Sequence, residues 1–415
     1  MQFLNEEYRA KLLNRFLRYV KVWTTSDSSK ADLNIQPSTQ RQFDLAKILE
    51  SELKDFGLSN VQITKNCYVY GKLDATAGFE KIPSFCLLSH MDTVEECSGE
   101  NVNPILEKIK IDDKPGNYEN PVQNTKSSFI EENDNLSDII IKTDGTTLLG
   151  ADDKAGIAEI MTMIEYLAEN KDFPHGQIEV CFSPDEETGH GMDNVPLDLI
   201  ESKQAYTVDG GNMGELETEC FNAYKSEIIF TGKSIHTGSA RGKLVNAVTM
   251  ASTFLTLLPK NESPETTDGK EGFFAPMEVS GTIENSKIVL FLRDFTVEGI
   301  ERRKSLVEKI AKTVEEITGG KSEVIHTFQY SNMKEGMEKS PSTVENLIKA
   351  YKESGIEPVF PAIRGGTDGS RLTEMGIPCP NIFTGGHNFH SKEEWASLKE
   401  MSCAVEVLLN LSKAR

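Results

Sequence analysis

The feature that most constrains this chain is a short apolar run that ends in a histidine and an acid. Residues 85–92 read Phe-Cys-Leu-Leu-Ser-His-Met-Asp, so His90 and Asp92 come at the end of a strand-like segment. Open α/β sheets bind their ligands beyond the carboxyl ends of their strands. We therefore predict an α/β fold that presents His90 and Asp92 at such an edge.

Four further stretches repeat this arrangement. Each carries carboxylates or imidazoles at or just beyond an apolar, strand-like segment. Together the five stretches can supply a ligand set of two histidines and three acids, with two further acids for supporting roles. One stretch alone is weak support, whereas five in one chain indicate a two-metal hydrolase. The four are residues 150–156 (Gly-Ala-Asp-Asp-Lys-Ala-Gly), 183–189 (Ser-Pro-Asp-Glu-Glu-Thr-Gly), 208–211 (Val-Asp-Gly-Gly) and 385–391 (Gly-Gly-His-Asn-Phe-His-Ser).

The charge of the chain disfavours two classes of partner. Acids outnumber bases 65 to 44, and the formal charge of -21 repels nucleic acid and anionic membrane surfaces. The plainer interpretation of that charge is a solvated acidic surface. No apolar run approaches the roughly 18 residues that suggest a membrane span, and the first residues lack the pattern of a secretory signal.

The seven cysteines are scattered and form no CxxC pair. We interpret them as free thiols, which places the protein in the cytoplasm. Cys97 lies near the first stretch and is an alternative metal ligand, although the carboxylates and imidazoles already form a set without it.

Apolar spacing predicts the local structure. It favours helices over residues 5–22 and 38–56, the second capped by Ser38 or Thr39, and a third helix beginning at Asp152. Strands are predicted near residues 61–63, 68–70, 85–89, 178–182 and 205–208. The alternation of strands and helices indicates a mostly parallel central sheet covered on both faces. Residues 114–138 are rich in Pro, Gly, Asn and Ser and are predicted to form a surface loop.

The pattern changes after about residue 220. Strands are predicted at 226–230, 287–293 and 322–328, and helices at 244–258 and 297–317. This order resembles the split βαβ, or ferredoxin-like, arrangement. With 415 residues there is room for two or three domains. We predict a catalytic domain formed by 1–220 and completed by 331–415, with an inserted α+β domain at 221–330.

Imidazole and carboxylate ligands without thiolate suit zinc, and manganese or cobalt are possible substitutes. Two divalent ions about 3.5–4 Å apart need a bridging anion. Asp152 or Asp153, at the start of a helix, is the natural candidate. The alternative is that this pair only caps the helix.

One histidine–acid pair and one pair of acids point to supporting roles. Alternate residues of a strand share one face, so Asp92 can orient His90; the alternative is a structural His–Asp pair. Glu186 and Glu187 are adjacent, and the economical interpretation makes one a metal ligand and the other a general base. The alternative for these two is a solvated acidic turn.

These residues closely resemble peptidase T, the tripeptide aminopeptidases of the co-catalytic zinc peptidase family, which also holds carboxypeptidase G-like enzymes and acyl-amino-acid deacylases. The similarity runs nearly from end to end of the chain and implies a zinc-exopeptidase-like catalytic domain. The matching residues are 37–39 (Pro-Ser-Thr), 89–93 (Ser-His-Met-Asp-Thr), 101–104 (Asn-Val-Asn-Pro), 148–156 (Leu-Leu-Gly-Ala-Asp-Asp-Lys-Ala-Gly), 184–189 (Pro-Asp-Glu-Glu-Thr-Gly), 208–211 and 364–369 (Arg-Gly-Gly-Thr-Asp-Gly).

The resemblance implies two Zn²⁺ ions per subunit, which Co²⁺ or Mn²⁺ can replace, and a metal-bridged hydroxide that attacks the peptide carbonyl. Asp92 would stand behind the first histidine, and Glu186 would be the general base. The ligands of the first ion would be His90, Asp152 and Asp209. The ligands of the second ion would be Asp152, Glu187 and His390, so that Asp152 bridges and His387 is not a ligand.

For the inserted domain the resemblance implies a lid that also forms a homodimer. His236 and Asn246 would bind substrate there. Without the resemblance, His236 would be interpreted as a surface histidine. Arg293 and Arg364 would bind a substrate anion, or equally form structural ion pairs.

Three residues depart from the family pattern: Thr237 replaces a usual Pro, Ser391 a usual Gly, and Glu393 a position that can hold His. The last two lie close to a metal ligand, and they put the tripeptide preference in question more than the hydrolysis. We therefore expect a dizinc aminopeptidase acting on short peptides. The alternatives are a dipeptidase or N-acyl-amino-acid deacylase on the same scaffold. A more remote alternative is a non-catalytic, metal-bound binding protein. Such a protein would be expected to lack a ligand or the base, whereas this chain has all of them.

Overall fold

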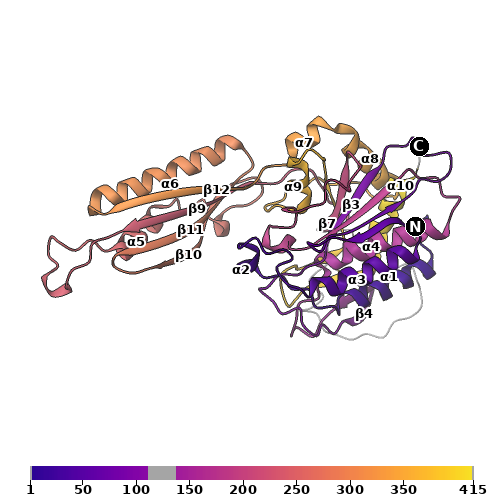
Figure 1. The fold of residues 1–415 in the computed structure, drawn as a ribbon, viewed down its shortest axis with the longest axis horizontal. Coiled ribbons are helices and arrows are strands. Elements are labelled where there is room, and N and C mark those ends of the chain that lie inside the picture. The colour runs from indigo at the N-terminus through magenta and orange to yellow at the C-terminus, as the bar shows by residue number, and fades with distance from the viewer. Residues whose placement is uncertain (1, 111–136, 414–415) are drawn as a thin grey trace. The chain divides into compact units, whose positions relative to one another are not determined.

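The computed structural model describes residues 2–110 and 137–413. It forms two compact units (Figure 1). The first comprises residues 1–218, 336–361 and 367–415, and the second comprises 219–335 and 362–366. The predicted boundaries place residues 362–366 in the catalytic domain. In the structure this segment, which contains Arg364, belongs to the second unit. The loop expected over 114–138 lies outside the described residues, except for Ser137 and Asp138, which begin a strand.

A seven-stranded sheet forms the centre of the first unit. Its four middle strands run parallel, and the strands toward both edges pair antiparallel. The α/β class with a largely parallel central sheet is therefore confirmed. In spatial order the strands are β1 (Ser59–Ile63), β2 (Val69–Leu73), β6 (Ile178–Ser183), β3 (Phe85–His90), β7 (Ala205–Gly210), β13 (Asn381–Phe383) and β8 (Leu216–Glu217).

Helices cover both faces of this sheet. Adjacent residues of β3 show the two sides: Leu87 belongs to the core formed with the long helices, and Leu88 packs in the core that contains Leu372. Because every residue of β3 and of β6 is buried, both strands are nearly continuous apolar runs. The helices of the first core are α1 (Glu6–Tyr19), α3 (Gln42–Asp55), α4 (Ala151–Glu169), α8 (Pro341–Glu353) and α10 (Leu398–Ser412), and α9 (Asp368–Glu374) lies on the other side.

Helix α3 begins later than predicted. It starts at Gln42, and its N-cap Arg41 makes no side-chain cap. The predicted cap at Ser38 or Thr39 is wrong, because Ser38 has a different partner. Its backbone N–H and its hydroxyl both donate to the buried carboxylate of Asp185, at 2.7 and 2.5 Å.

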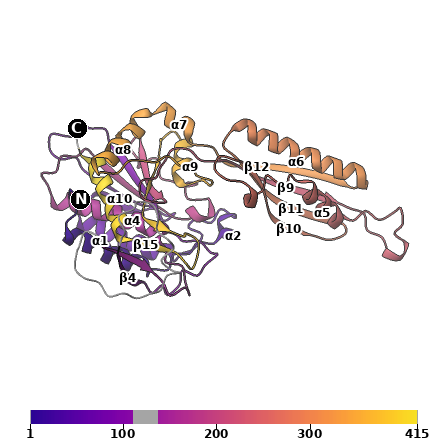
Figure 2. The same ribbon diagram turned by 180° about the vertical axis from the view of Figure 1, so that it is seen from behind.

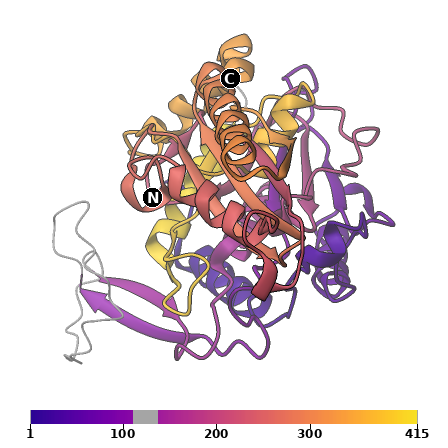
Figure 3. The same ribbon diagram turned by 90° about the vertical axis from the view of Figure 1, so that its left-hand side faces the viewer.

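A small antiparallel sheet in the first unit was not predicted. Its order is β14 (Gly386–His387), β15 (Trp395–Ser397), β5 (Ser137–Lys142) and β4 (Ile105–Lys110). Strands β4 and β5 pair along their whole length (Figure 3). Strand β15 leads directly into α10 (Figure 2). The segment between β14 and β15 carries His390, so this sheet determines where that histidine lies.

The second unit has the order β-α-β-β-α-β and one antiparallel sheet, β10-β11-β9-β12. Helices α5 and α6 contact each other and share one apolar core with this sheet. The strand β10 was not predicted; it is an edge strand that contains Pro276, and its residues from Pro276 onward are exposed. The elements are β9 (Asn222–Thr231), α5 (Ala247–Leu257), β10 (Phe273–Gly281), β11 (Asn285–Asp294), α6 (Val297–Thr318) and β12 (Lys321–Tyr330).

Within the part of the chain that the structure describes, no helix combines the length and the apolar content needed to cross a membrane.

Candidate metal centre

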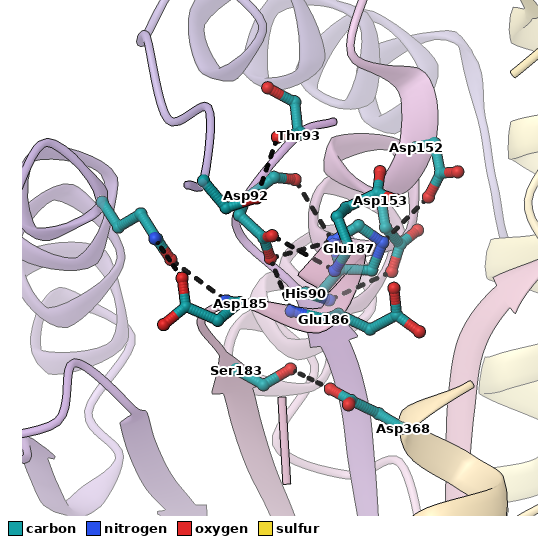
Figure 4. Close-up of polar contacts among 12 residues, drawn as sticks. His90, Asp92, Thr93, Asp152, Asp153, Ser183, Asp185, Glu186, Glu187 and Asp368 are labelled. Atoms are coloured by element: carbon teal, nitrogen blue, oxygen red, sulfur yellow. Dashed lines mark hydrogen bonds and ion pairs between the residues drawn. The ribbon is translucent and has the colours of Figure 1, made fainter. Parts of the chain in front are cut away.

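His90 is the last residue of β3, at the carboxyl edge of the central sheet, and only 2% of its surface is exposed. Its Nε2 lies 2.8 Å from Asp152 Oδ1 and 3.6 Å from Asp209 Oδ1. Asp209 comes from the neighbouring parallel strand β7. Two adjacent strand ends and the start of α4 therefore bring one imidazole and two carboxylates together. Figure 4 shows His90 and Asp152 of this group.

The irregular turn at the start of α4 directs Asp152 and Asp153 to different partners. Gly150 is left-handed, with φ 78°, and both aspartates have non-helical backbone angles. The Asp152 carboxylate faces His90 with Oδ1 and His390 with Oδ2, at 2.8 and 3.1 Å. Asp153 instead accepts hydrogen bonds from the Ser89 hydroxyl and from the His90 backbone N–H. Of the two acids, the structure places Asp152 between the two histidines.

The acidic turn after β6 supplies the third side of the site. Glu186 and Glu187 begin a short 3₁₀ helix whose N-cap, Asp185, has a left-handed φ of 59°. Glu187 Oε2 lies 3.1 Å from His390 Nε2, so Asp152, Glu187 and His390 form a second ligand group. Its other oxygen, Oε1, is buried and accepts no hydrogen bond from any described residue. The Glu186 carboxylate belongs to neither ligand group.

Asp92 lies behind His90 and beneath the acidic turn. Its Oδ1 is 3.4 Å from His90 Nδ1, and its backbone carbonyl is 3.2 Å from the same nitrogen. Its two carboxylate oxygens also accept the backbone N–H groups of Glu186 and Glu187, at 3.0 and 3.2 Å. Asp92 thus contacts both the first histidine and the turn that carries the two glutamates.

The two histidines of the C-terminal stretch have different surroundings. His390 is in the second ligand group, and 48% of its side chain is exposed. His387 stacks on the ring of Trp395 and lies 2.8 Å from Glu400 Oε2, away from both ligand groups. Cys97 approaches His390 only through the backbone, with its Sγ 3.7 Å from the carbonyl, and is in neither group.

The electrostatics of the site favour cations. Burial raises the pKa of Glu187 to about 8 and that of Asp209 to about 6, and it raises the pKa of Glu186 well above its usual range. Hydrogen bonds to Asp152 and Glu187 raise the pKa of His390 to about 11. Several buried carboxylates side by side are costly unless positive charge is present. Imidazoles, carboxylates and the unpartnered Glu187 oxygen together form a donor set that fits two divalent cations.

Three supporting acids were not assigned by sequence reasoning. Asp185 accepts the Gln42 side-chain amide at 2.6 Å and donates its own N–H to that side chain. Asp368 is buried and accepts the hydroxyl of Ser183, at the end of β6. Glu394 accepts backbone N–H groups of the turn before α4. Asp185 and Asp368 lie inside motifs that the sequence shows, whereas nothing in the sequence signals Glu394.

His236 and Asn246 belong to the second unit. His236 is exposed and accepts the backbone N–H of Gly238 through Nδ1, at 3.1 Å. Asn246 caps α5 by accepting the N–H of Val248 at 2.9 Å. These contacts hold local turns and identify no ligand, so a role in substrate binding stays a prediction.

The two arginines predicted to bind a substrate anion also lie in the second unit. Both donate hydrogen bonds to residues of that unit. Arg293 is 8% exposed and donates to the Tyr224 carbonyl at 3.3 Å and to Gln329 Oε1 at 3.0 Å. Arg364 donates to the carbonyls of Gly269 and Glu271, both at 2.9 Å. Neither guanidinium pairs with a carboxylate among the described residues.

The chain is similar to known proteins over nearly its whole length. Residues 143–414 match the model of the peptidase family M20/M25/M40. The chain is 45% identical over 405 residues to peptidase T of Clostridium perfringens, covering 97% of this chain and 98% of that protein. It is 42% identical over 407 residues to peptidase T of Geobacillus thermodenitrificans, covering 98% of each.

Solved structures share the fold. An aminopeptidase from Bacillus cereus superposes with a TM-score of 0.73 at 23% identity, covering 97% of this chain and 98% of that one. A tripeptidase from Staphylococcus aureus gives a TM-score of 0.77 at 21% identity, covering 99% and 98%. A dinuclear metal-binding peptidase from Bacillus subtilis gives 0.67 at 13% identity, covering 98% of each chain.

Proposed function

Because this chain belongs to the peptidase family M20/M25/M40 and to its peptidase T group, we propose that it is a dizinc aminopeptidase that releases the N-terminal residue of tripeptides. The relatives named peptidase T match the chain over nearly its whole length, and the tripeptidase of S. aureus shares its fold. Metal binding and peptide hydrolysis both belong to the first unit in this assignment.

One observation carries the proposal: the Asp152 carboxylate faces two imidazoles with different oxygens, His90 Nε2 at 2.8 Å from Oδ1 and His390 Nε2 at 3.1 Å from Oδ2. A carboxylate used in this way is suited to bridge two cations. Asp209 completes one ligand group and Glu187 the other. Zinc is the proposed metal because the donors are imidazoles and carboxylates.

When bound, two zinc ions polarise a peptide carbonyl and lower the pKa of a water molecule. The Glu186 carboxylate is half-buried and belongs to neither ligand group, so we assign it the proton transfer. It accepts a proton from the attacking water and delivers it to the amine as the C–N bond breaks. Burial raises the pKa of Glu186, which favours uptake of a proton by this carboxylate. Asp92 orients His90 and holds the turn that carries the base.

The finer assignments are also proposals. We assign substrate contacts to His236, Asn246, Arg293 and Arg364, and assign the second unit the roles of lid and homodimer interface. They are supported by the resemblance to peptidase T and by the ferredoxin-like order of that unit. Cys67, Cys86, Cys97, Cys181, Cys379 and Cys403 form no disulfide, which supports a cytoplasmic location.

Peptide hydrolysis with purified protein tests the function. We expect free tripeptides to be cleaved in the presence of Zn²⁺, Co²⁺ or Mn²⁺, with release of the N-terminal residue. Dipeptides, tetrapeptides, N-acetylated tripeptides and N-acyl amino acids are the comparison substrates. Equal turnover of N-acetylated and free tripeptides would contradict an aminopeptidase. Preference for dipeptides or N-acyl amino acids would identify the alternative activity on the same scaffold.

A further inference from the structure

Glu394 links the segment that carries His390 to the turn that carries Asp152. It follows His390 in the chain, immediately before β15, and is 2% exposed. Its Oε2 accepts the backbone N–H groups of Leu149 and Gly150, at 2.8 and 2.7 Å. Its Oε1 accepts the backbone N–H of Asp152 at 3.1 Å. A single carboxylate therefore contacts three backbone groups of the turn that leads to the shared ligand.

That turn lacks a cap of its own. The N-cap position of α4 is Gly150, which has no side chain to accept the free N–H groups of the first helical turn. Asp152 and Asp153 have non-helical backbone angles, so the regular hydrogen bonds of the helix do not hold this turn either. The carboxylate of Glu394 takes the place of the missing cap, and the positive end of the helix favours its negative charge.

A second contact fixes the other side of the turn. Asp153 accepts the Ser89 hydroxyl and the His90 N–H, which ties the turn to the end of β3. Glu394 ties the same turn to the segment of His390. Asp152 lies between these two attachments, and its carboxylate faces both histidines. Both attachments therefore determine where the Asp152 carboxylate lies relative to His90 and His390.

We propose that Glu394 is a positioning residue for the metal pair, since it holds the Asp152 carboxylate where it can serve both ligand groups. The inference rests on the proposed dinuclear centre. Glu394 is not itself a ligand, because its oxygens are used by backbone N–H groups and it belongs to neither group. Partners of metal ligands typically change metal affinity 10–100-fold when they are replaced.

The variant Glu394→Gln tests this, because it keeps the shape but places an NH₂ group against backbone N–H donors. Metal-free wild type, Glu394→Gln and the control Glu7→Gln, which changes an exposed acid on α1, are titrated with Zn²⁺ by calorimetry without any peptide. We expect two ions per wild-type chain, affinity about 10–100-fold weaker in Glu394→Gln, and wild-type affinity in Glu7→Gln. Excess Zn²⁺ should restore kcat of Glu394→Gln toward wild type with little change in KM, which a purely structural defect would not allow.

Unchanged Zn²⁺ affinity in folded Glu394→Gln would overturn the inference. If circular dichroism shows that this variant is unfolded, Glu394→Asp decides, because it keeps the charge but is too short to reach all three N–H groups. Weaker Zn²⁺ binding by Glu394→Asp supports the inference, and wild-type binding overturns it. A wild type that binds two ions but cleaves no tripeptide contradicts only the proposed function. A wild type that binds no ion contradicts both.

Discussion

The carboxylate of Asp92 accepts the backbone N–H of Glu186 at 3.0 Å. The same oxygen lies 3.4 Å from His90 Nδ1, and the second oxygen accepts the N–H of Glu187. Asp92 thus contacts both the His90 ring and the turn that carries Glu186 and Glu187. A change at Asp92 reaches both the metal ligands and the proposed base.

We expect Asp92→Asn to lower both metal affinity and kcat, by about 10–100-fold each. The amide keeps one acceptor oxygen, but its NH₂ group must face a backbone N–H or the His90 ring. Calorimetric titration with Zn²⁺ and tripeptide hydrolysis measure the two effects. The control is Asp193→Asn, because Asp193 pairs with His190 outside both ligand groups. Wild-type metal affinity in Asp92→Asn would show that His90 does not depend on this carboxylate.

Glu186→Gln and Glu187→Gln should separate base from ligand. Glu186 lies outside both ligand groups, so Glu186→Gln should keep two metals and lose ~10²–10⁴-fold in rate, the typical contribution of general acid–base catalysis. Glu187 belongs to the second group, so Glu187→Gln should lose metal occupancy. Metal analysis of the purified variants, together with tripeptide kinetics, distinguishes them. Wild-type activity in Glu186→Gln, or a missing metal there, would reverse the assignment.

His390→Ala should weaken one metal site and stop turnover, whereas His387→Ala should change activity only modestly. His390 Nε2 lies 3.1 Å from both Asp152 and Glu187, while His387 pairs with Glu400 and stacks on Trp395. The two variants are matched controls for each other, since both remove an imidazole from one short segment. Loss of a metal in His387→Ala, with two retained in His390→Ala, would refute the ligand assignment.

Removal of metal should lower thermal stability. Ions that bind only the folded chain stabilise it by about 2.7 kcal/mol when their free concentration is 100 times Kd. The clustered carboxylates of the site should also repel one another more strongly once the cations are gone. Differential scanning calorimetry with EDTA, and then with added Zn²⁺, measures the shift in Tm. We expect a smaller Zn²⁺-dependent gain in His390→Ala, and an equal gain would argue against this histidine as a ligand.

The strand ends of the site could be predicted because a buried strand is recognisable as a local run of apolar residues. The apolar run that ends at His90 forms β3, and its acid and histidine lie at the carboxyl edge of the sheet, as expected. The edge strand β10 could not be predicted in this way, since its later residues are exposed. The small sheet that carries the His390 segment was not predicted, because the pairing of β15 with β5 joins distant parts of the chain.

The sequence by itself determined which donors this protein possesses and that they follow buried strands, because residue type and apolar spacing are local properties. From the residues alone, Asp152 and Asp153 were equal candidates for the bridge. Only the tertiary structure turned one toward the two histidines and the other toward Ser89. It also brought Glu394 to the turn before α4 and Ser38 to Asp185. Such contacts depend on the path of the whole chain, which places chemically equivalent carboxylates in different surroundings.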